Sequence, residues 1–73
     1  MKIYLVPVGI VKKYMKELEL DISADFTSGR LIKRLNLPEK LKTVCFVNGK
    51  RTDCDGRFTE GAVVKIVSTI AGG

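Results

Sequence analysis

One segment of this 73-residue chain has the spacing of an amphipathic helix, and the other patterned segments have the composition or period of β-strands. The helical segment follows Thr27, a favourable N-cap residue, and its apolar positions are Leu31, Ile32 and Leu35. A single helix with one apolar stripe must bury that stripe against one face of a sheet. We therefore predict one α+β domain, residues 1–73, in which a small mixed sheet packs on one helix.

The expected strands lie on both sides of this helix and give the order β-β-α-β-β-β. They cover residues 2–8, 17–22, 43–47, 50–52 and 62–67. Leu37-Pro38 should end the helix, and Asn48-Gly49 should form a two-residue hairpin turn that places Cys45 opposite Thr52. The nearly unbroken apolar run of the last strand favours a central position beside the first strand, covered on both faces or nearly so. This arrangement is the ubiquitin-like β-grasp.

The net charge is compatible with a nucleic-acid partner, but the rest of the sequence does not favour one. The formal net charge of +5 is compatible with a nucleic-acid-binding module, and Lys12, Lys13 and Lys16 flank Tyr14 in the connector of residues 9–16. The other basic residues are spread along the chain, and no aromatic-basic strand motif of the RNA-binding type is present. A solvated basic surface is the favoured interpretation. No apolar run has the length of a membrane span, and no targeting segment is recognisable, which favours the cytoplasm.

The chain has two cysteines and no histidine. Two thiolates alone cannot complete a tetrahedral zinc site, so no metal is expected. We interpret Cys45 as a small apolar strand residue and Cys54 as a loop thiol. Without a histidine as base or a glycine-rich phosphate loop, an autonomous enzyme is not expected.

The sequence closes with Ile70-Ala71-Gly72-Gly73, directly after the last strand. Glycine has no Cβ and adopts backbone conformations that other residues avoid. A flexible tail of residues 69–73 could therefore thread into a narrow enzyme cleft and present its carboxylate for activation. The alternative is a frayed terminus without function, because the last residues of domains are often small and disordered.

The combination of these features resembles the ThiS/MoaD family of sulfur carrier proteins. The resemblance covers nearly the whole chain: the order of elements, the helix that Thr27 begins, the hairpin at Val47-Asn48-Gly49, the stretch of residues 58–64 and the Gly-Gly ending. In that family an E1-like adenylyltransferase activates the terminal carboxylate with ATP. Sulfur from a cysteine desulfurase or another persulfide donor then produces a thiocarboxylate.

The resemblance implies a role for each residue near the end of the chain. Gly73 would carry the reactive carbonyl, and Gly72, which has no side chain, would leave the approach to it unobstructed. No cofactor would be permanently bound. The partner-binding residues would be Phe58, Val67, Ile70 and Ala71, although Phe58 and Val67 could equally complete the core. The carried sulfur would pass to a synthase, either thiazole synthase or the large subunit of molybdopterin synthase.

The sequence leaves two questions open. The Ile-Ala-Gly-Gly ending favours the thiamin carriers, whereas the long connector of residues 9–16 favours the molybdopterin subunit. A ubiquitin-like modifier joined to other proteins through Gly73 would begin with the same acyl-adenylate, so carrier and modifier are not separated by the sequence.

Overall fold

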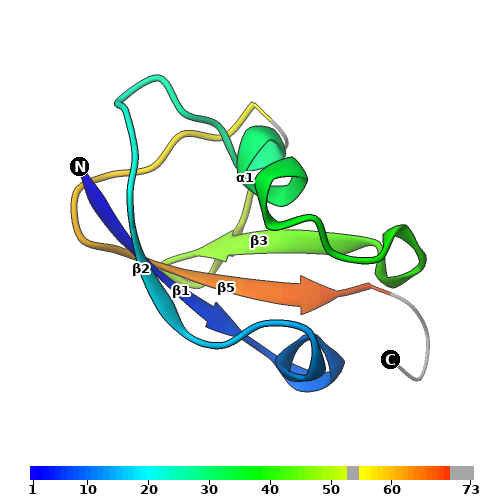
Figure 1. The fold of residues 1–73 in the computed structure, drawn as a ribbon. Coiled ribbons are helices and arrows are strands. Elements are labelled where there is room, and N and C mark those ends of the chain that lie inside the picture. Colours follow the sequence, from blue (N-terminus) through cyan, green and yellow to red (C-terminus); the bar gives the residue numbers. More distant parts are fainter. Residues whose placement is uncertain (53–54, 70–73) are drawn as a thin grey trace.

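The computed structural model describes residues 1–52 and 55–69, which form a five-stranded mixed sheet with one α-helix against one face (Figure 1). The elements in chain order are β1 (Lys2–Pro7), the 3-10 helix η1 (Gly9–Lys13), β2 (Leu18–Asp21), α1 (Ser28–Leu35), the 3-10 helix η2 (Glu39–Leu41), β3 (Thr43–Val47), β4 (Lys50–Arg51) and β5 (Ala62–Ser68). The strand order across the sheet is β2-β1-β5-β3-β4. This confirms the predicted β-grasp and the predicted order of strands and helix.

Strand β5 lies at the centre of the sheet, as predicted. It runs parallel to β1, with Tyr4 beside Val63, and antiparallel to β3, with Cys45 beside Ile66. The prediction that both faces of β5 are covered is wrong, because α1 covers only one of them. The Val63 side chain is 42% exposed on the outer face, and the neighbouring outward position, Lys65, is also exposed.

The core lies between α1 and the inner face of the sheet. Leu31 of α1 is fully buried among inward-facing side chains of the two central parallel strands, including Ile3 and Ile66. Burying aliphatic side chains of this size contributes about 1.5–3 kcal/mol each to folding. The one helix and the alternating strand positions thus share a single apolar layer.

Helix α1 has a cap at each end. The Oγ1 atom of Thr27 accepts a hydrogen bond from the backbone N–H of Arg30 at 3.3 Å, which confirms the predicted N-cap. The helix ends at Leu35, two residues before the predicted Leu37-Pro38 boundary, because Asn36 adopts the left-handed conformation with φ 52°. Asparagine is one of the few residues that tolerate this conformation at a helix end.

The β3–β4 hairpin has the predicted turn. Asn48 and Gly49 have φ values of 49° and 87°, which is the pattern of a type I′ turn. The Asn48 side-chain oxygen also accepts a hydrogen bond from Val63 N at 3.2 Å, which ties the turn to β5. Thr52 N donates to the Cys45 carbonyl oxygen at 3.0 Å, so Cys45 faces Thr52 as expected.

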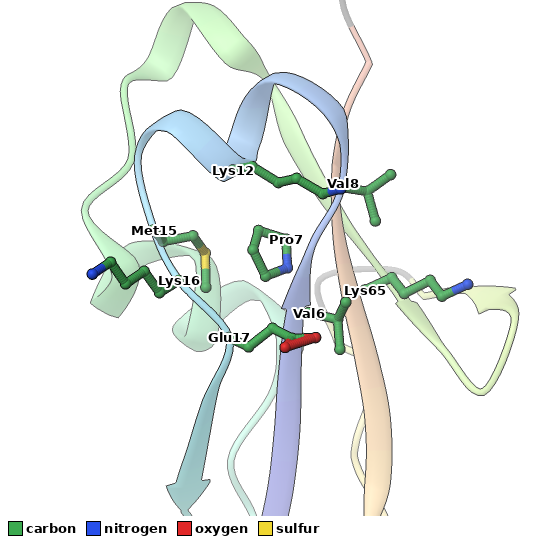
Figure 2. A pocket seen from close by; sticks show the side chains of 8 residues that line it. All are labelled: Val6, Pro7, Val8, Lys12, Met15, Lys16, Glu17 and Lys65. Carbon is green, nitrogen blue, oxygen red and sulfur yellow. The ribbon is translucent and has the colours of Figure 1, made fainter.

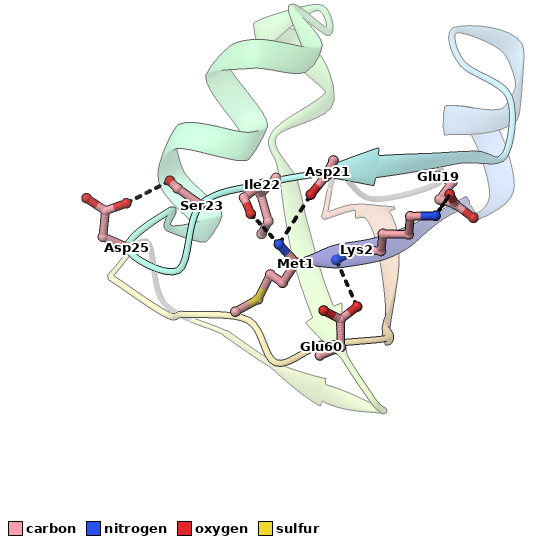
Figure 3. Close-up of polar contacts among 8 residues, drawn as sticks. All are labelled: Met1, Lys2, Glu19, Asp21, Ile22, Ser23, Asp25 and Glu60. Carbon is pink, nitrogen blue, oxygen red and sulfur yellow. Dashed lines mark hydrogen bonds and ion pairs between the residues drawn. The ribbon is translucent and has the colours of Figure 1, made fainter.

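Polar contacts fasten the start of β1 to β2 and to the loop before β5 (Figure 3). The Met1 amino group donates to the Ile22 carbonyl oxygen at 2.8 Å, and Lys2 N donates to a Glu60 carboxylate oxygen at 2.9 Å. Lys2 Nζ lies 3.2 Å from Glu19 Oε2. The hydrogen bond to Glu19 and the charge of that carboxylate raise the pKa of Lys2. These contacts lie at the end of the sheet remote from η1 and η2.

Strand β2 differs from its expected burial. Leu18 and Leu20 pair with the buried Leu5 and Ile3, so the predicted alternation has the right phase. Leu18 is nevertheless 39% exposed, because β2 is an edge strand and part of it lies beyond the cover of α1.

Candidate functional site

The end of β5 is fixed to η2 and the residue after it. Ser68 Oγ donates a 2.7 Å hydrogen bond to the Leu41 carbonyl oxygen, and Thr69 Oγ1 donates one of the same length to the Lys42 carbonyl oxygen. The backbone N–H of Thr69 donates to the same Lys42 oxygen at 3.3 Å. Thr69 was expected to be the first residue of a free tail. It is instead an anchored surface residue, because the turn after η2 brings the Lys42 carbonyl within its reach.

The predicted reactive residues Gly72 and Gly73, and the predicted partner-binding residues Ile70 and Ala71, lie outside the described residues. The structure therefore defines the base from which that segment starts. This base comprises the last residues of β5 together with η1 and η2, and all three are at the same end of the sheet in Figure 1.

Phe58 is in the core and is not exposed for partner binding. Its side chain is only 5% exposed and belongs to the same buried cluster as Leu31. The loop before β5 is held against the start of α1, where Ser28 N donates to the Gly56 carbonyl oxygen at 2.9 Å, and this contact positions Phe58 inward. The core alternative for Phe58 is the one that the structure confirms.

Val67 has a different environment. It is half-buried on the outer face of the sheet, where it pairs with Val44 of β3. The structure therefore does not bring Phe58 and Val67 together, since one is in the core and the other on the opposite side of the sheet. Of the two, only Val67 remains a candidate contact near the base of the tail.

The outer face of the sheet carries further apolar side chains that the sequence reasoning did not single out. Tyr4 and Val63 are neighbours in the parallel pair and are each 42% exposed. Phe46 is half-buried on β3, two residues beyond Val44. We call the five residues Tyr4, Val44, Phe46, Val63 and Val67 the outer apolar face. Their signal in the sequence is apolar side chains at both phases of the alternation in β3 and β5.

Lysines surround the base of the tail. Six lysines lie at this end of the sheet or in the elements that pack against it: Lys12, Lys13, Lys16, Lys40, Lys42 and Lys65. All are exposed, and none forms an ion pair with a residue in the described ranges. Most of the described carboxylates are elsewhere, as Asp21 and Glu60 at the opposite end show (Figure 3). This end of the sheet therefore carries a net positive charge, with these six lysines against Glu17 and Glu39.

Few of the described residues could act in catalysis or bind a metal ion. Cys45 is buried, with 2% exposure, and burial raises the pKa of its thiol to about 11, so it is a packed apolar residue as predicted. Cys54 lies outside the described residues. Within residues 1–52 and 55–69, no three His, Cys, Asp or Glu side chains gather in a way that could hold a metal ion. No helix in the same residues has the length and apolar character required to cross a membrane.

The fold is shared with several solved structures. SAMP1 from Haloferax volcanii matches over 100% of both chains with a TM-score of 0.78 and 12% identity. A putative molybdopterin converting factor, subunit 1, from Pyrococcus furiosus matches over 94% of this chain and 98% of that one, with a TM-score of 0.75 and 18% identity. Caldiarchaeum subterraneum ubiquitin matches over 100% and 98%, with a TM-score of 0.73 and 23% identity.

These likenesses show that the chain has a ubiquitin-like β-grasp fold. No protein-family model matches the sequence, and no curated protein matches it. The match is thus one of architecture over nearly the full length, and a shared architecture does not by itself define an activity.

Proposed function

We propose that this chain is a sulfur carrier whose Gly73 carboxylate is adenylated by an E1-like enzyme and converted to a thiocarboxylate. One observation carries the proposal. The central strand β5 reaches the surface at Thr69, where two hydrogen bonds to Lys42 hold it, and the sequence Ile-Ala-Gly-Gly follows directly. The likeness to a molybdopterin converting factor subunit over almost the whole of both chains supports the same role.

The chemistry requires little of this chain beyond its terminal carboxylate. A Gly73 oxygen would attack the α-phosphate of ATP, and pyrophosphate would leave. The terminal sulfur of a partner's persulfide would then attack the activated carbonyl carbon and displace AMP. A second thiol would cleave the resulting acyl disulfide, leaving the thiocarboxylate on Gly73. The absence of a side chain on Gly72 and Gly73 keeps the approach to the carbonyl open.

The outer apolar face supports docking to the activating enzyme. It is continuous with the base of the tail through Val67, and large apolar groups next to a functional segment often dominate a binding interface. Ile70 and Ala71 would extend this contact along the tail. The acceptor of the sulfur would be a synthase, with thiazole and molybdopterin synthesis as the two candidate pathways.

Reconstitution tests the proposal. The chain is incubated with a candidate E1-like enzyme, a cysteine desulfurase, cysteine and ATP, and pyrophosphate release and the mass of the chain are followed. Wild type should gain the mass that accompanies replacement of one oxygen by sulfur. Deletion of Gly73 should abolish both readouts, whereas Asp25→Asn, an exposed change remote from the tail, should preserve them. Pyrophosphate release that is indifferent to the Gly73 deletion would contradict the proposal.

A second role, as a protein modifier, is favoured by the likeness to a ubiquitin over the whole chain. In this case a lysine amine of another protein would attack the Gly73 adenylate and form an isopeptide bond. Trypsin cleaves after Lys65, so residues 66–73 would remain on the acceptor lysine as a recognisable remnant. Remnants in lysates without any thiocarboxylate would favour the modifier, and the reverse result would favour the carrier.

A further inference from the structure

A hollow of about 560 Å³ is lined by the end of β1, η1, the loop before β2 and Lys65 in the middle of β5 (Figure 2). Val8 N donates to the Ile66 carbonyl oxygen at 3.0 Å, which fixes the start of η1 against β5 and shapes this hollow. Its apolar lining includes Val6, Val8 and Met15, and its basic lining is Lys12, Lys16 and Lys65. We call it the basic hollow.

The three lysines of the basic hollow have no charge partner in the described part of the chain. Lys2 at the other end of the sheet shows the contrast, since its ammonium group lies 3.2 Å from Glu19. Glu17 is the one acidic residue that lines the hollow, so the charge there stays positive. Figure 2 shows Lys16 and Lys65 extending on opposite sides of the hollow. Gathering like charges around an apolar depression is unfavourable for the isolated domain and complementary to an acidic surface.

We propose that the basic hollow is a docking site for an acidic segment of the protein that receives the tail. An apolar side chain of that segment would lie against Val6, Val8 and Met15, and carboxylates on either side of it would meet Lys12, Lys16 and Lys65. This inference rests on the proposed function, because that function requires a partner to approach the end of β5. The outer apolar face would then provide contact area, and the basic hollow would orient the partner.

The lining favours a protein segment over a nucleic acid. Nucleic-acid sites combine a basic track with aromatic side chains on which bases stack. The lining residues of the hollow include no aromatic side chain, and the Glu17 carboxylate would repel a phosphate backbone. The three lysines also come from separate places in the chain, namely η1, the loop before β2 and β5. They line the hollow together with Val6, Val8 and Met15, an arrangement that suits an apolar side chain flanked by carboxylates.

A peptide titration tests the site without any partner enzyme. The probe is a synthetic hexapeptide in which glutamates flank a leucine, and amide chemical shifts of the folded chain are followed by NMR. Shifts should concentrate on Val8, Lys12 and Lys65 and should shrink as salt is added. Uniform shifts over all basic residues, or no shifts, would overturn the proposal.

Two matched variants distinguish the effect of charge at the basic hollow from the effect of net charge on peptide binding. In the test variant Lys12, Lys16 and Lys65 are replaced by Gln, and in the control variant Lys50, Arg30 and Arg57 are replaced by Gln, with the same change in net charge. Loss of three exposed charge pairs should weaken peptide binding about tenfold in the test variant. The control should stay within about twofold of wild type, as general screening predicts. Equal losses in both variants would contradict a local site.

The same variants distinguish this inference from the proposed function. In the reconstituted adenylation assay the test variant should raise the KM for the chain about tenfold at unchanged kcat. If wild type is not activated at all, the proposed function fails, whereas peptide binding still decides the basic hollow. If activation proceeds with the same KM in the test variant and wild type, the docking inference alone fails. Tighter binding of a short duplex DNA than of the peptide, lost in the test variant, would overturn the protein partner.

Discussion

The side-chain hydroxyl of Thr69 donates a 2.7 Å hydrogen bond to the carbonyl oxygen of Lys42. This contact joins the last residue that the structure describes to the turn after η2, where Lys42 adopts a left-handed conformation with φ 48°. Together with the Ser68–Leu41 hydrogen bond, it sets the direction in which β5 leaves the sheet. The segment that contains the proposed reactive carboxylate therefore starts from a defined point.

Removal of the Thr69 hydroxyl should affect activation more than stability. Thr69→Val keeps the shape but loses the side-chain hydrogen bond, which at an exposed position is worth about 1 kcal/mol or less. We expect nearly unchanged urea unfolding and a several-fold lower kcat/KM in the adenylation assay, because the base of the tail is less well oriented. Thr59→Val, at an exposed threonine before β5, is the matched control. Equal kinetics for Thr69→Val and wild type would show that the anchor has no role in activation.

Substitutions of Phe58 and Val63 should distinguish a core residue from a surface residue by their effects on stability. Phe58→Ala removes a buried ring and should lower the free energy of unfolding by about 3–5 kcal/mol. Val63→Ala is on the exposed outer face and should change it by about 0.5 kcal/mol or less. Val63→Ala should instead raise the KM for the chain in the adenylation assay. Thermal and urea unfolding of both variants measure the changes in stability, and the adenylation assay measures the KM. A fully stable Phe58→Ala protein would contradict the observed core.

The contribution of the Thr27 cap to the stability of the domain should be measurable by single substitutions. Thr27→Ala removes the acceptor of the Arg30 N–H and should destabilise the domain by about 1 kcal/mol. Thr27→Ser retains a hydroxyl at the same position and should restore most of the loss. Comparable destabilisation by both substitutions would mean that the methyl group of Thr27, and not its hydrogen bond, is responsible.

The buried thiol of Cys45 should make stability fall at high pH. Its folded-state pKa, about 11, lies above its ordinary value of 9.0, so the folded state holds the proton more tightly than the unfolded state. The contribution is complete below pH 9 and is lost as the pH rises to about 11, with a total on the order of 2–3 kcal/mol. Urea unfolding at pH 8 and pH 11 measures it.

Cys45→Ala is the reference for this measurement, because it lacks the thiol and retains every other group of the protein. The pH dependence should be steeper in wild type than in the variant. In a Cys54→Ser background, Cys45 should also resist alkylation at pH 8 until denaturant is added. Rapid alkylation of the folded protein would contradict its burial.

The sequence predicted those elements whose signals are local. The Thr27 cap, the Asn48-Gly49 turn and the bounds of β3 each depend on a few adjacent residues, and each is confirmed. Burial was harder to predict, because it depends on what covers a residue. Leu18 alternates as a core residue should, yet it lies on an edge strand, and Val63 is part of an apolar run but faces away from α1.

The candidate site shows the same limit. Phe58 is in a polar loop, and nothing local indicates that contacts between Ser28 and Gly56 turn that loop toward the core. The grouping of Lys12 with Lys65 depends on the parallel pairing of β1 and β5, which joins segments more than fifty positions apart. The anchoring of Thr69 depends on the fold of η2 in the same way. Such long-range relations follow from topology and are not visible in sequence spacing.

The intact mass of the protein purified from its own host shows directly whether Gly73 carries sulfur. We expect a chain that ends at Gly73, with a fraction that has sulfur in place of one carboxylate oxygen. Iodoacetamide should react with that sulfur even in a variant that lacks both cysteines. A chain that continues past Gly73, or that never carries sulfur or an isopeptide bond at this residue, would exclude both the carrier and the modifier role.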